Sequence, residues 1–305
     1  MIFSFFIPTY KRAESLRICI TSIFKYWEGG KEIIISDNNE DDIAKNVVEK
    51  FDSDYIYYSS NMQNIGIDKN MLRFLELCKT RYCWLLGDDD SLNEKAYDSI
   101  TPLLNDDLDF IILLNGIDVK GYESGIYDSS DIDKVGNAFI SFWDKIPFGN
   151  IIVNVERARK VDFDKCYLKY LGTSHAYSGV LWELALSEFS SGKFGVITTP
   201  NIEVCDVTKT WTDSSVRIHF KEIPLWFGLL PKSIKIYTDK AYKKYLNRIC
   251  SPFSILYFIR FCEHNKDNKK ILKCSIDKMP LSYKINWFFV DLLFPIYKRY
   301  KKIKN

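Results

Sequence analysis

The sequence has little of what most often builds disulfide frameworks, zinc sites or membrane spans. Its eight cysteines are scattered without a Cys-x-x-Cys pair, and it contains only three histidines. Scattered cysteines in apolar surroundings favour reduced core thiols over disulfides or a zinc site. No uninterrupted apolar run is long enough to cross a bilayer, and no signal-like basic and apolar leader opens the chain. We therefore expect a cytoplasmic protein.

The charge is distributed unevenly over 305 residues of which 47% are hydrophobic. Residues 231–305 contain 18 Lys and Arg against five Asp and Glu, whereas residues 1–230 contain 24 basic and 35 acidic groups. This contrast predicts two parts, with a boundary near residue 230 and a basic, mainly helical C-terminal region at 231–305. The acidic first part disfavours nucleic acid as a partner. There is no internal repeat and no low-complexity linker.

Strand and helix patterns alternate along the first part. An apolar run at 2–7 ends at Pro8, and apolar residues then recur at helical spacing until Gly29 and Gly30. The same reading predicts further strands at 32–36, 55–59, 82–85 and 110–114, with 151–155 and 196–198 continuing the sheet, and helices near 41–51, 68–78 and 180–186. Such alternation predicts an α/β fold with a mostly parallel sheet and helices on both faces.

Three consecutive aspartates, Asp88, Asp89 and Asp90, follow the apolar strand at 82–85. Adjacent carboxylates repel one another unless a cation or hydrogen-bond donors offset the charge. Oxygen ligands on a short turn suit Mg²⁺ or Mn²⁺, and the carboxyl ends of parallel strands are where open α/β sheets bind ligands. Thr9 and Asp37 also follow strands and should converge on this edge. The alternative is a solvated acidic turn that caps the next helix.

Four motifs in the first hundred residues resemble those of family 2 glycosyltransferases of the GT-A fold. They are Phe-Phe-Ile-Pro-Thr-Tyr-Lys-Arg at 5–12, Ser-Asp-Asn at 36–38, Asn-Ile-Gly-Ile-Asp-Lys-Asn at 64–70, and Asp-Asp-Asp at 88–90, in the place of a DXD-type metal motif. The sequence Trp-Leu-Leu-Gly-Asp-Asp-Asp at 84–90 most resembles the abequosyltransferase-like branch of the family, whose enzymes build bacterial surface polysaccharides. The resemblance thins after about residue 110.

The resemblance implies a GT-A catalytic domain at 1–230, with a donor half at about 1–110 and an acceptor half at about 111–230. It also implies a nucleotide-sugar site in which Asp37 meets the base, Arg12 faces phosphate and Asp90 binds the Mn²⁺ or Mg²⁺ that bridges the diphosphate. The donor-binding residues expected on this basis are Pro8, Thr9, Tyr10, Arg12, Asp37, Asn64, Gly66, Asn70, Asp88 and Asp89.

The catalytic base is harder to place. The family usually carries an Asp before a helix of the acceptor pocket, whereas this chain has Gly-Thr-Ser-His-Ala-Tyr at 172–177. We expect His175 to act as the base or beside it, with Glu183 as its rival and Asp162 and Asp164 as weaker ones. Segments 208–213 and 217–219 resemble the loop that closes over donor and acceptor, and His219 is expected to add a metal or phosphate contact.

The implied function is metal-dependent, inverting transfer of a sugar from a nucleotide sugar to a hydroxyl of a bacterial surface glycan, such as a lipid-linked precursor of O-antigen or capsule. A nucleotidyltransferase is an alternative, but it would show a glycine-rich phosphate loop after the first strand, and residues 8–12 contain no glycine. A second alternative is a non-catalytic protein that binds a sugar or a membrane.

The basic end of the chain suggests where the protein works. An apolar stretch at 287–294 is too short to span a bilayer and is followed by a basic cluster at 298–302. Such a pairing favours peripheral binding to an anionic membrane, here its inner face. A helix packed on the catalytic domain, with a solvated tail, is an equal alternative.

Overall fold

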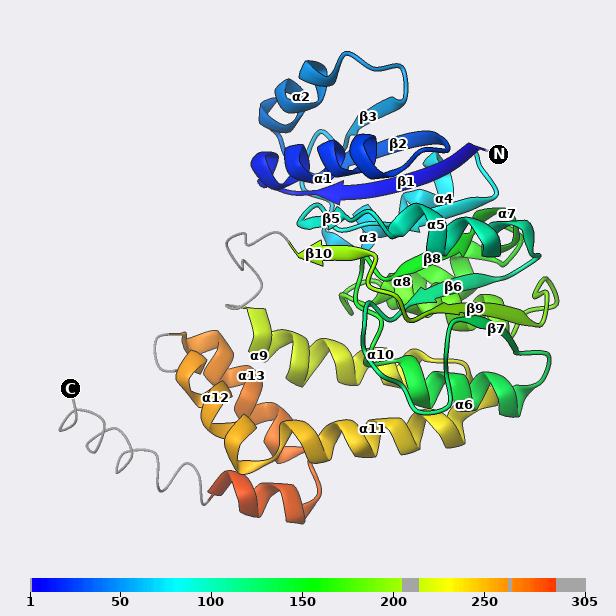
Figure 1. Ribbon diagram of the computed structural model, residues 1–305. Helices are drawn as coiled ribbons and strands as arrows, with labels where there is room; N and C mark the ends of the chain where they lie inside the picture. Colours follow the sequence, from blue (N-terminus) through cyan, green and yellow to red (C-terminus); the bar gives the residue numbers. More distant parts are fainter. Residues whose placement is uncertain (1, 205–213, 263–264, 289–305) are drawn as a thin grey trace. The chain divides into compact units, whose positions relative to one another are not determined.

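The computed structural model describes residues 2–204, 214–262 and 265–288 (Figure 1). The chain divides into two compact units. In terms of the described residues, the first comprises 2–171, 175–204 and 231–234, and the second comprises 172–174, 214–230, 235–262 and 265–288. The segment 214–230 therefore groups with the C-terminal helices and not with the sheet.

An eight-stranded sheet forms the centre of the first unit, in the order β3-β2-β1-β4-β8-β6-β9-β7. Its strands are β1 (Ile2–Thr9), β2 (Gly30–Asp37), β3 (Ile56–Ser60), β4 (Tyr82–Leu85), β6 (Phe110–Leu113), β7 (Gly125–Asp128), β8 (Ile151–Asn154) and β9 (Lys193–Ile197). Only β8 and β7 run against the other six. The mostly parallel sheet predicted from the sequence is confirmed. A separate pair joins β5 (Asp90–Leu92) to β10 (Ile202–Val204).

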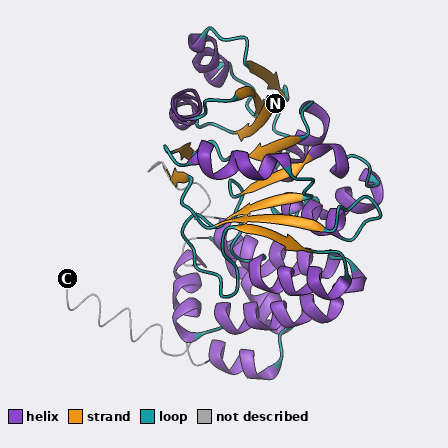
Figure 2. Cartoon of the chain, turned by 45° about the vertical axis from the view of Figure 1, so that its right-hand side comes forward, coloured by secondary structure: helices purple, strands orange, loops and turns teal. Residues whose placement is uncertain are grey.

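Helices cover both faces of this sheet (Figure 2). They are α1 (Ala13–Tyr26), α2 (Ile43–Val48), α3 (Ile67–Leu72), α4 (Phe74–Leu77), α5 (Ala96–Ile100), α6 (Ile132–Phe142), α7 (Val155–Ala158) and α8 (Ala176–Ala185), with single turns η1 (Glu49–Phe51), η2 (Thr101–Asn105), η3 (Phe163–Tyr167), η4 (Leu168–Tyr170) and η7 (Lys232–Ile234). Side chains of β1 alternate between the two faces. Phe3 stacks on Trp27 beyond the end of α1 (4.7 Å between ring centroids), whereas Phe6 meets Phe74 of α4 (6.1 Å).

The second unit is helical. It contains α9 (Ser215–Arg217), η6 (Ile218–Glu222), α10 (Ile223–Leu229), α11 (Lys235–Ile249), α12 (Pro252–Cys262) and α13 (Lys266–Asp277). Its core is aromatic: Phe220 lies edge-on to Phe258 (4.8 Å) and to Trp287 (5.8 Å). In the part of the chain that the structure describes, no helix is both long and apolar enough to cross a membrane.

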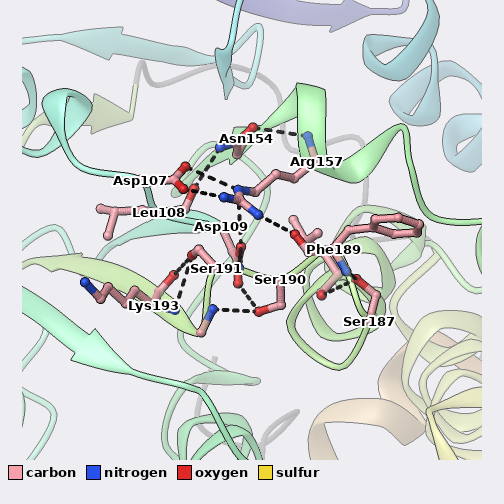
Figure 3. A network of polar contacts seen from close by, with 12 residues as sticks. Asp107, Leu108, Asp109, Asn154, Arg157, Ser187, Phe189, Ser190, Ser191 and Lys193 are labelled. Carbon is pink, nitrogen blue, oxygen red and sulfur yellow. Dashed lines mark hydrogen bonds and ion pairs between the residues drawn. The ribbon is translucent and has the colours of Figure 1, made fainter.

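A polar network joins the amino ends of β4 and β6, at the edge of the sheet opposite to the aspartate triplet (Figure 3). Asp107 accepts hydrogen bonds from Arg81 and Arg157. The buried Asp109 accepts from the Ser190 hydroxyl (2.5 Å) and from the Ser191 backbone N–H (2.7 Å). Burial raises the pKa of Asp109, whereas the hydrogen bond from Arg157 lowers the pKa of the exposed Asp107. This network ties the amino ends of β4 and β6 to the segment that follows α8.

Candidate active site

The aspartate triplet forms a tight turn directly after β4. The backbone N–H of Asp90 donates to the Gly87 carbonyl (3.1 Å), and the Gly87 N–H donates back to the Asp90 carboxylate (3.2 Å). Asp88 and Asp90 are 5% and 6% exposed, whereas the side chain of Asp89 is 36% exposed. The turn therefore holds two carboxylates inside the protein and one at its surface.

Asp88 is held by the end of β1 and the start of α1. The Thr9 hydroxyl donates to its Oδ2 (2.8 Å), and Nη1 of Arg12 donates to its Oδ1 (3.0 Å). The same Nη1 also reaches Oδ2 of Asp89 (2.9 Å). Burial raises the pKa of Asp88 to about 6, although the charge of Arg12 and the hydrogen bond from Thr9 oppose the shift.

Asp37 lies at the carboxyl end of β2, next to the end of β1. It is fully buried and accepts hydrogen bonds from the Tyr58 hydroxyl (2.6 Å) and from the Asn39 backbone N–H (2.9 Å). Burial raises the pKa of the Tyr58 hydroxyl, which therefore stays protonated as the donor of this bond. The Asn39 side chain accepts from the Lys11 N–H (3.0 Å), so the ends of β1 and β2 are tied together.

An amide network fixes the loop between β3 and α3 against the end of β2. Asn38 donates to Asn64 (2.9 Å), and the Asn70 side chain exchanges hydrogen bonds with Ser36, accepting from its hydroxyl (2.6 Å) and donating to its carbonyl (3.1 Å). Gly66 precedes α3 with φ +86°, a backbone conformation that favours glycine. The loop residues expected to bind the donor thus hold one another and the sheet edge in place.

The Asp90 carboxylate faces Gly149, just before β8. A methyl group at Gly149 (φ +103°) would collide with Asp90, and the Gly149 carbonyl accepts from the Trp84 indole N–H (2.6 Å). Burial, with the charges of Asp89 and Asp88, raises the pKa of Asp90 to about 8. Within the described residues only the Gly87 N–H donates to this carboxylate, so most of its acceptor capacity is unused.

The ligand atoms of the turn suit a hard divalent cation, because all of them are oxygens. The buried Asp90 carboxylate accepts only one hydrogen bond from the described residues, so a cation beside it would stabilise its charge. Among residues 2–204, 214–262 and 265–288, however, no three His, Cys, Asp or Glu side chains are arranged as a finished cation site. Such a cation would therefore take part of its oxygen ligands from substrate and water.

His175 lies at the start of α8, on the same edge of the first unit. Its ring stacks on Tyr177 (6.0 Å between centroids), and Tyr177 meets Phe148 edge-on (5.3 Å), next to the Gly149 that faces Asp90. His175 is half-buried. Two aromatic contacts thus link His175 to Phe148, the residue before Gly149.

Glu183 lies eight residues after His175, about 12 Å further along the axis of α8. Its carboxylate accepts from the Tyr170 hydroxyl (2.7 Å) and pairs with Lys169 (2.6 Å). Asp162 caps η3 and, like Asp164, is exposed. The catalytic roles of all these residues stay predictions, but the contacts of Glu183 are those of an acid that joins α8 to η4.

His219 belongs to the second unit, in η6. Its Nδ1 lies 2.9 Å from the Tyr245 hydroxyl, which itself donates to the His219 carbonyl (2.9 Å). Arg217 pairs with Glu222 of the same unit (3.2 Å). The expected loop at 208–213 lies outside the described residues.

Some residues of this edge were not predicted. Tyr58 and Arg73 hold Asp37 and the loop before α3, with Arg73 donating to Ser36 (3.0 Å) and Ser59 (2.8 Å). Gly149, next to Asp90, is the third residue that was not predicted. A tyrosine inside a strand, an arginine between two short helices and a lone glycine carry no signal in a single sequence, because only the tertiary packing gives them partners.

Residues 4–150 match the family described as glycosyl transferase family 2. A stretch of 108 residues, 34% of this chain, is 37% identical to the abequosyltransferase RfbV of Salmonella typhimurium. That stretch spans only 32% of the relative's own length.

Solved structures share the fold over nearly the whole chain. Residues 1–349 of S. aureus TarS, in complex with UDP-GlcNAc, match with a TM-score of 0.57 and 13% identity over 97% of this chain and 92% of that one. The mannosyltransferase PcManGT of Pyrobaculum calidifontis, with GDP-Man and Mn²⁺, matches with a TM-score of 0.54 and 11% identity over 98% and 82%. At these identities the likeness concerns the fold alone.

Proposed function

We propose that residues 4–150, which match glycosyl transferase family 2, form a domain of that family, and that the protein transfers a sugar from a nucleotide sugar to a hydroxyl of a bacterial surface polysaccharide. The single observation that carries the proposal is the convergence, at one sheet edge, of the ends of β1, β2 and β4 with Thr9, Asp37 and the aspartate turn. The similar abequosyltransferase supports the acceptor class.

The donor would lie along this edge. Nucleotide sugars are the ligands of the two solved structures of like fold, UDP-GlcNAc in TarS and GDP-Man in PcManGT. In this chain Asp37 would accept from the base, and Tyr58 and Asn39 keep its carboxylate in place for that contact. Arg12 and the N–H groups after Pro8 would meet the ribose and the diphosphate. Asn64, Gly66 and Asn70 would shape the loop beside them.

A divalent cation would bind at Asp90, with Asp88 and Asp89 beside it. When bound, Mg²⁺ or Mn²⁺ neutralises the charge that develops on the departing nucleoside diphosphate. PcManGT was solved with Mn²⁺, which supports this class of cofactor. Because Gly149 has no side chain, the Asp90 carboxylate can pack directly against the backbone before β8.

We propose a single displacement with inversion. The acceptor oxygen forms a bond to the anomeric carbon as the bond from that carbon to the diphosphate oxygen breaks, and the acceptor's proton passes to a base. A neutral imidazole can accept such a proton, which suits His175. Glu183, held by Lys169 and Tyr170, suits the role less.

The C-terminal region would hold the enzyme at a membrane that carries its lipid-linked acceptor. The composition of 231–305 supports this, since basic residues near an anionic surface contribute about 1 kcal/mol each. Of the predicted apolar stretch at 287–294, Trp287 is buried against Phe220, whereas residues 289–294 and the basic cluster at 298–302 lie outside the described residues. Liposome binding should fall when the chain is ended at Pro280, and equal binding by the shortened protein would contradict the membrane role.

Incubation with UDP-, CDP-, GDP- and dTDP-sugars tests the function. We expect one donor to release nucleoside diphosphate when acceptor and Mn²⁺ are present. A nucleotidyltransferase would release pyrophosphate from a nucleoside triphosphate and a sugar phosphate instead. A binding protein would bind a sugar or nucleotide sugar without turnover, and either result would contradict the proposal.

A further inference from the structure

We propose that a cavity beside α3 and α4 binds the hydrocarbon chain of a lipid phosphate, and that this lipid is the one that carries the acceptor glycan. The inference rests on the proposed function, because it concerns the acceptor of the same reaction. All residues that line the cavity belong to the first unit, whereas the proposed membrane contact belongs to residues 231–305.

The cavity has a volume of about 560 Å³, which is within the range of pockets that bind small molecules. Its lining is mainly apolar. Leu72 and Leu75 line it from α3 and α4, and Val161, Phe163 and Leu168 line it from the chain after α7. Phe163 and Leu168 are also exposed, at 42% and 37%. Exposed apolar side chains beside a cavity are typical of a surface that binds a ligand or a partner.

The polar side chains inside the cavity have partners within the protein. The Tyr167 hydroxyl donates to the Ala158 carbonyl (2.8 Å), and Arg73 donates to serine hydroxyls of β2 and β3 (3.0 and 2.8 Å). A sugar, a nucleotide or a peptide that entered the cavity would lose hydrogen bonds to water and find few replacements, which is costly. A hydrocarbon chain has no hydrogen bonds to lose, so the interior favours such a chain.

The exposed rim of the cavity is mainly basic. Lys69 and Arg159 line it with exposed side chains, and the only acid among the described residues of the lining, Glu76, lies 3.8 Å from Arg73. Arg159 also donates to two backbone carbonyls at the end of α4, which holds it at the rim. Ammonium and guanidinium groups form charge-assisted hydrogen bonds with phosphate. The charges therefore favour a lipid with an anionic head group, its chain inside the cavity and its phosphate at Lys69.

The position of the cavity favours the acceptor's lipid over the lipids of the surrounding membrane. Ile65 and Lys69 come from the segment 64–70, which is expected to shape the donor site. Leu171 lies four residues before His175, the expected base. A lipid phosphate at Lys69 would thus lie beside residues that are expected to serve both substrates. The lipid of the acceptor must come to this place, whereas a lipid of the bulk membrane need not.

Isothermal titration calorimetry of the full-length protein with butyl, hexyl, octyl and decyl phosphate tests the cavity. Each phosphate is used below its micelle-forming concentration, without donor or metal. We expect each added methylene to strengthen binding about fourfold until the chain fills the cavity. Decyltrimethylammonium has the same chain and the opposite charge, and it should bind at least about tenfold more weakly than decyl phosphate. No binding of decyl phosphate, equal binding of the butyl and decyl phosphates, or equal binding of decyltrimethylammonium would overturn the inference.

Two variants at exposed positions locate the site. Leu168→Asp puts a charge into the lining and Lys69→Glu reverses the charge at the rim, and both should weaken decyl phosphate binding at least about tenfold. The matched controls, Leu225→Asp at an exposed leucine of α10 and Lys120→Glu at an exposed lysine before β7, should bind like wild type. Circular dichroism confirms that each variant is folded. If the site variants bind as tightly as their controls, the inference is wrong.

Vesicles of phosphatidylglycerol separate the two sources of lipid phosphate. Sedimentation with these vesicles should be the same for wild type and Leu168→Asp, because the cavity is reserved for the acceptor's lipid. Loss of vesicle binding in Leu168→Asp would assign the cavity to a membrane phospholipid and overturn the inference. A negative result in any of these assays leaves the proposed function standing, since that function is tested separately by the release of nucleoside diphosphate.

Discussion

The carboxylate of Asp68 accepts a hydrogen bond from the backbone N–H of Ala176 (3.2 Å). Asp68 is buried in α3, at the end of the loop that Asn64 and Asn70 hold against β2, and Ala176 is the first residue of α8. The contact joins segments 108 residues apart and sets where α8 begins, directly after His175. Through it, the expected donor loop and the expected acceptor helix share one support.

Replacing Asp68 with alanine should therefore affect both stability and turnover. Loss of a carboxylate acceptor at a helix start costs about 1 kcal/mol in the free energy of unfolding. Because His175 would also shift, we expect turnover to fall by at least about tenfold. Asp131→Ala is the control: Asp131 caps α6 in the same way (2.8 Å to the Lys134 N–H) but is exposed on another helix. Normal turnover in Asp68→Ala would contradict the positioning role.

The identity of the base is decided by two variants under saturating donor and acceptor. We expect His175→Ala to lose roughly 10²- to 10⁴-fold in turnover, the usual contribution of a general base. Glu183→Gln should keep near-normal turnover, because amide and carboxylate both accept from Tyr170 and only the ion pair with Lys169 is lost. The reverse pattern would assign the base to Glu183.

Gly149 should tolerate no side chain. A Cβ there would collide with the Asp90 carboxylate, and a φ of +103° strains any other residue. Gly149→Ala should lower the free energy of unfolding by at least about 1 kcal/mol, measured by urea denaturation, and should weaken Mn²⁺-dependent turnover. Gly125→Ala, in β7, meets open space and should change neither. Equal behaviour of the two variants would count against a crowded Asp90 site.

Asp109 and Asp107 should contribute to the pH dependence of stability with opposite signs. Burial raises the folded-state pKa of Asp109, so its contribution is present at low pH and is lost as the pH rises from the usual carboxylic value of about 4. Arg157 lowers the pKa of Asp107, whose contribution is present above about pH 4 and is lost as the pH falls below it.

Urea denaturation between pH 3 and pH 7 checks these signs. Relative to wild type, Asp109→Asn should gain stability as the pH rises, whereas Asp107→Asn should lose it. If the stability of both variants relative to wild type changed with pH in the same direction, the opposite effects proposed for Asp109 and Asp107 would be wrong.

Much of the fold could be predicted because its long strands carry strong local signals. The apolar runs before Pro8 and at 33–35 are buried on both faces, as expected for central parallel strands. The antiparallel course of β8 could not be predicted, since its three apolar residues give the same pattern in either direction. β7 alternates half-buried and exposed residues over only four positions, and β5 and β10 have three residues each, too few for a pattern.

The site residues that directly follow strand ends could be predicted from the sequence. The contacts that depend on side-chain packing could not. Thr9, Asp37 and Asp88 meet at one edge because parallel strands end there together. Which acid is buried, and that Arg12 bridges two of them, depends on side-chain geometry that strand patterns do not encode. In the same way, the spacing of His175 and Glu183 in the sequence did not reveal that Glu183 forms an ion pair with Lys169.

We propose that Asp90 binds the cation on which sugar transfer depends, and the variant Asp90→Asn is the decisive test of this role. Nucleoside diphosphate release should be measured with the active donor and Mn²⁺, for wild type, for Asp90→Asn and for wild type in excess EDTA, with near- and far-ultraviolet circular dichroism to confirm folding. We expect a folded variant, since the amide replaces a buried carboxylate of the same shape, with no measurable turnover and with wild type equally inactive in EDTA. Full turnover by Asp90→Asn, or by wild type in EDTA, would contradict it.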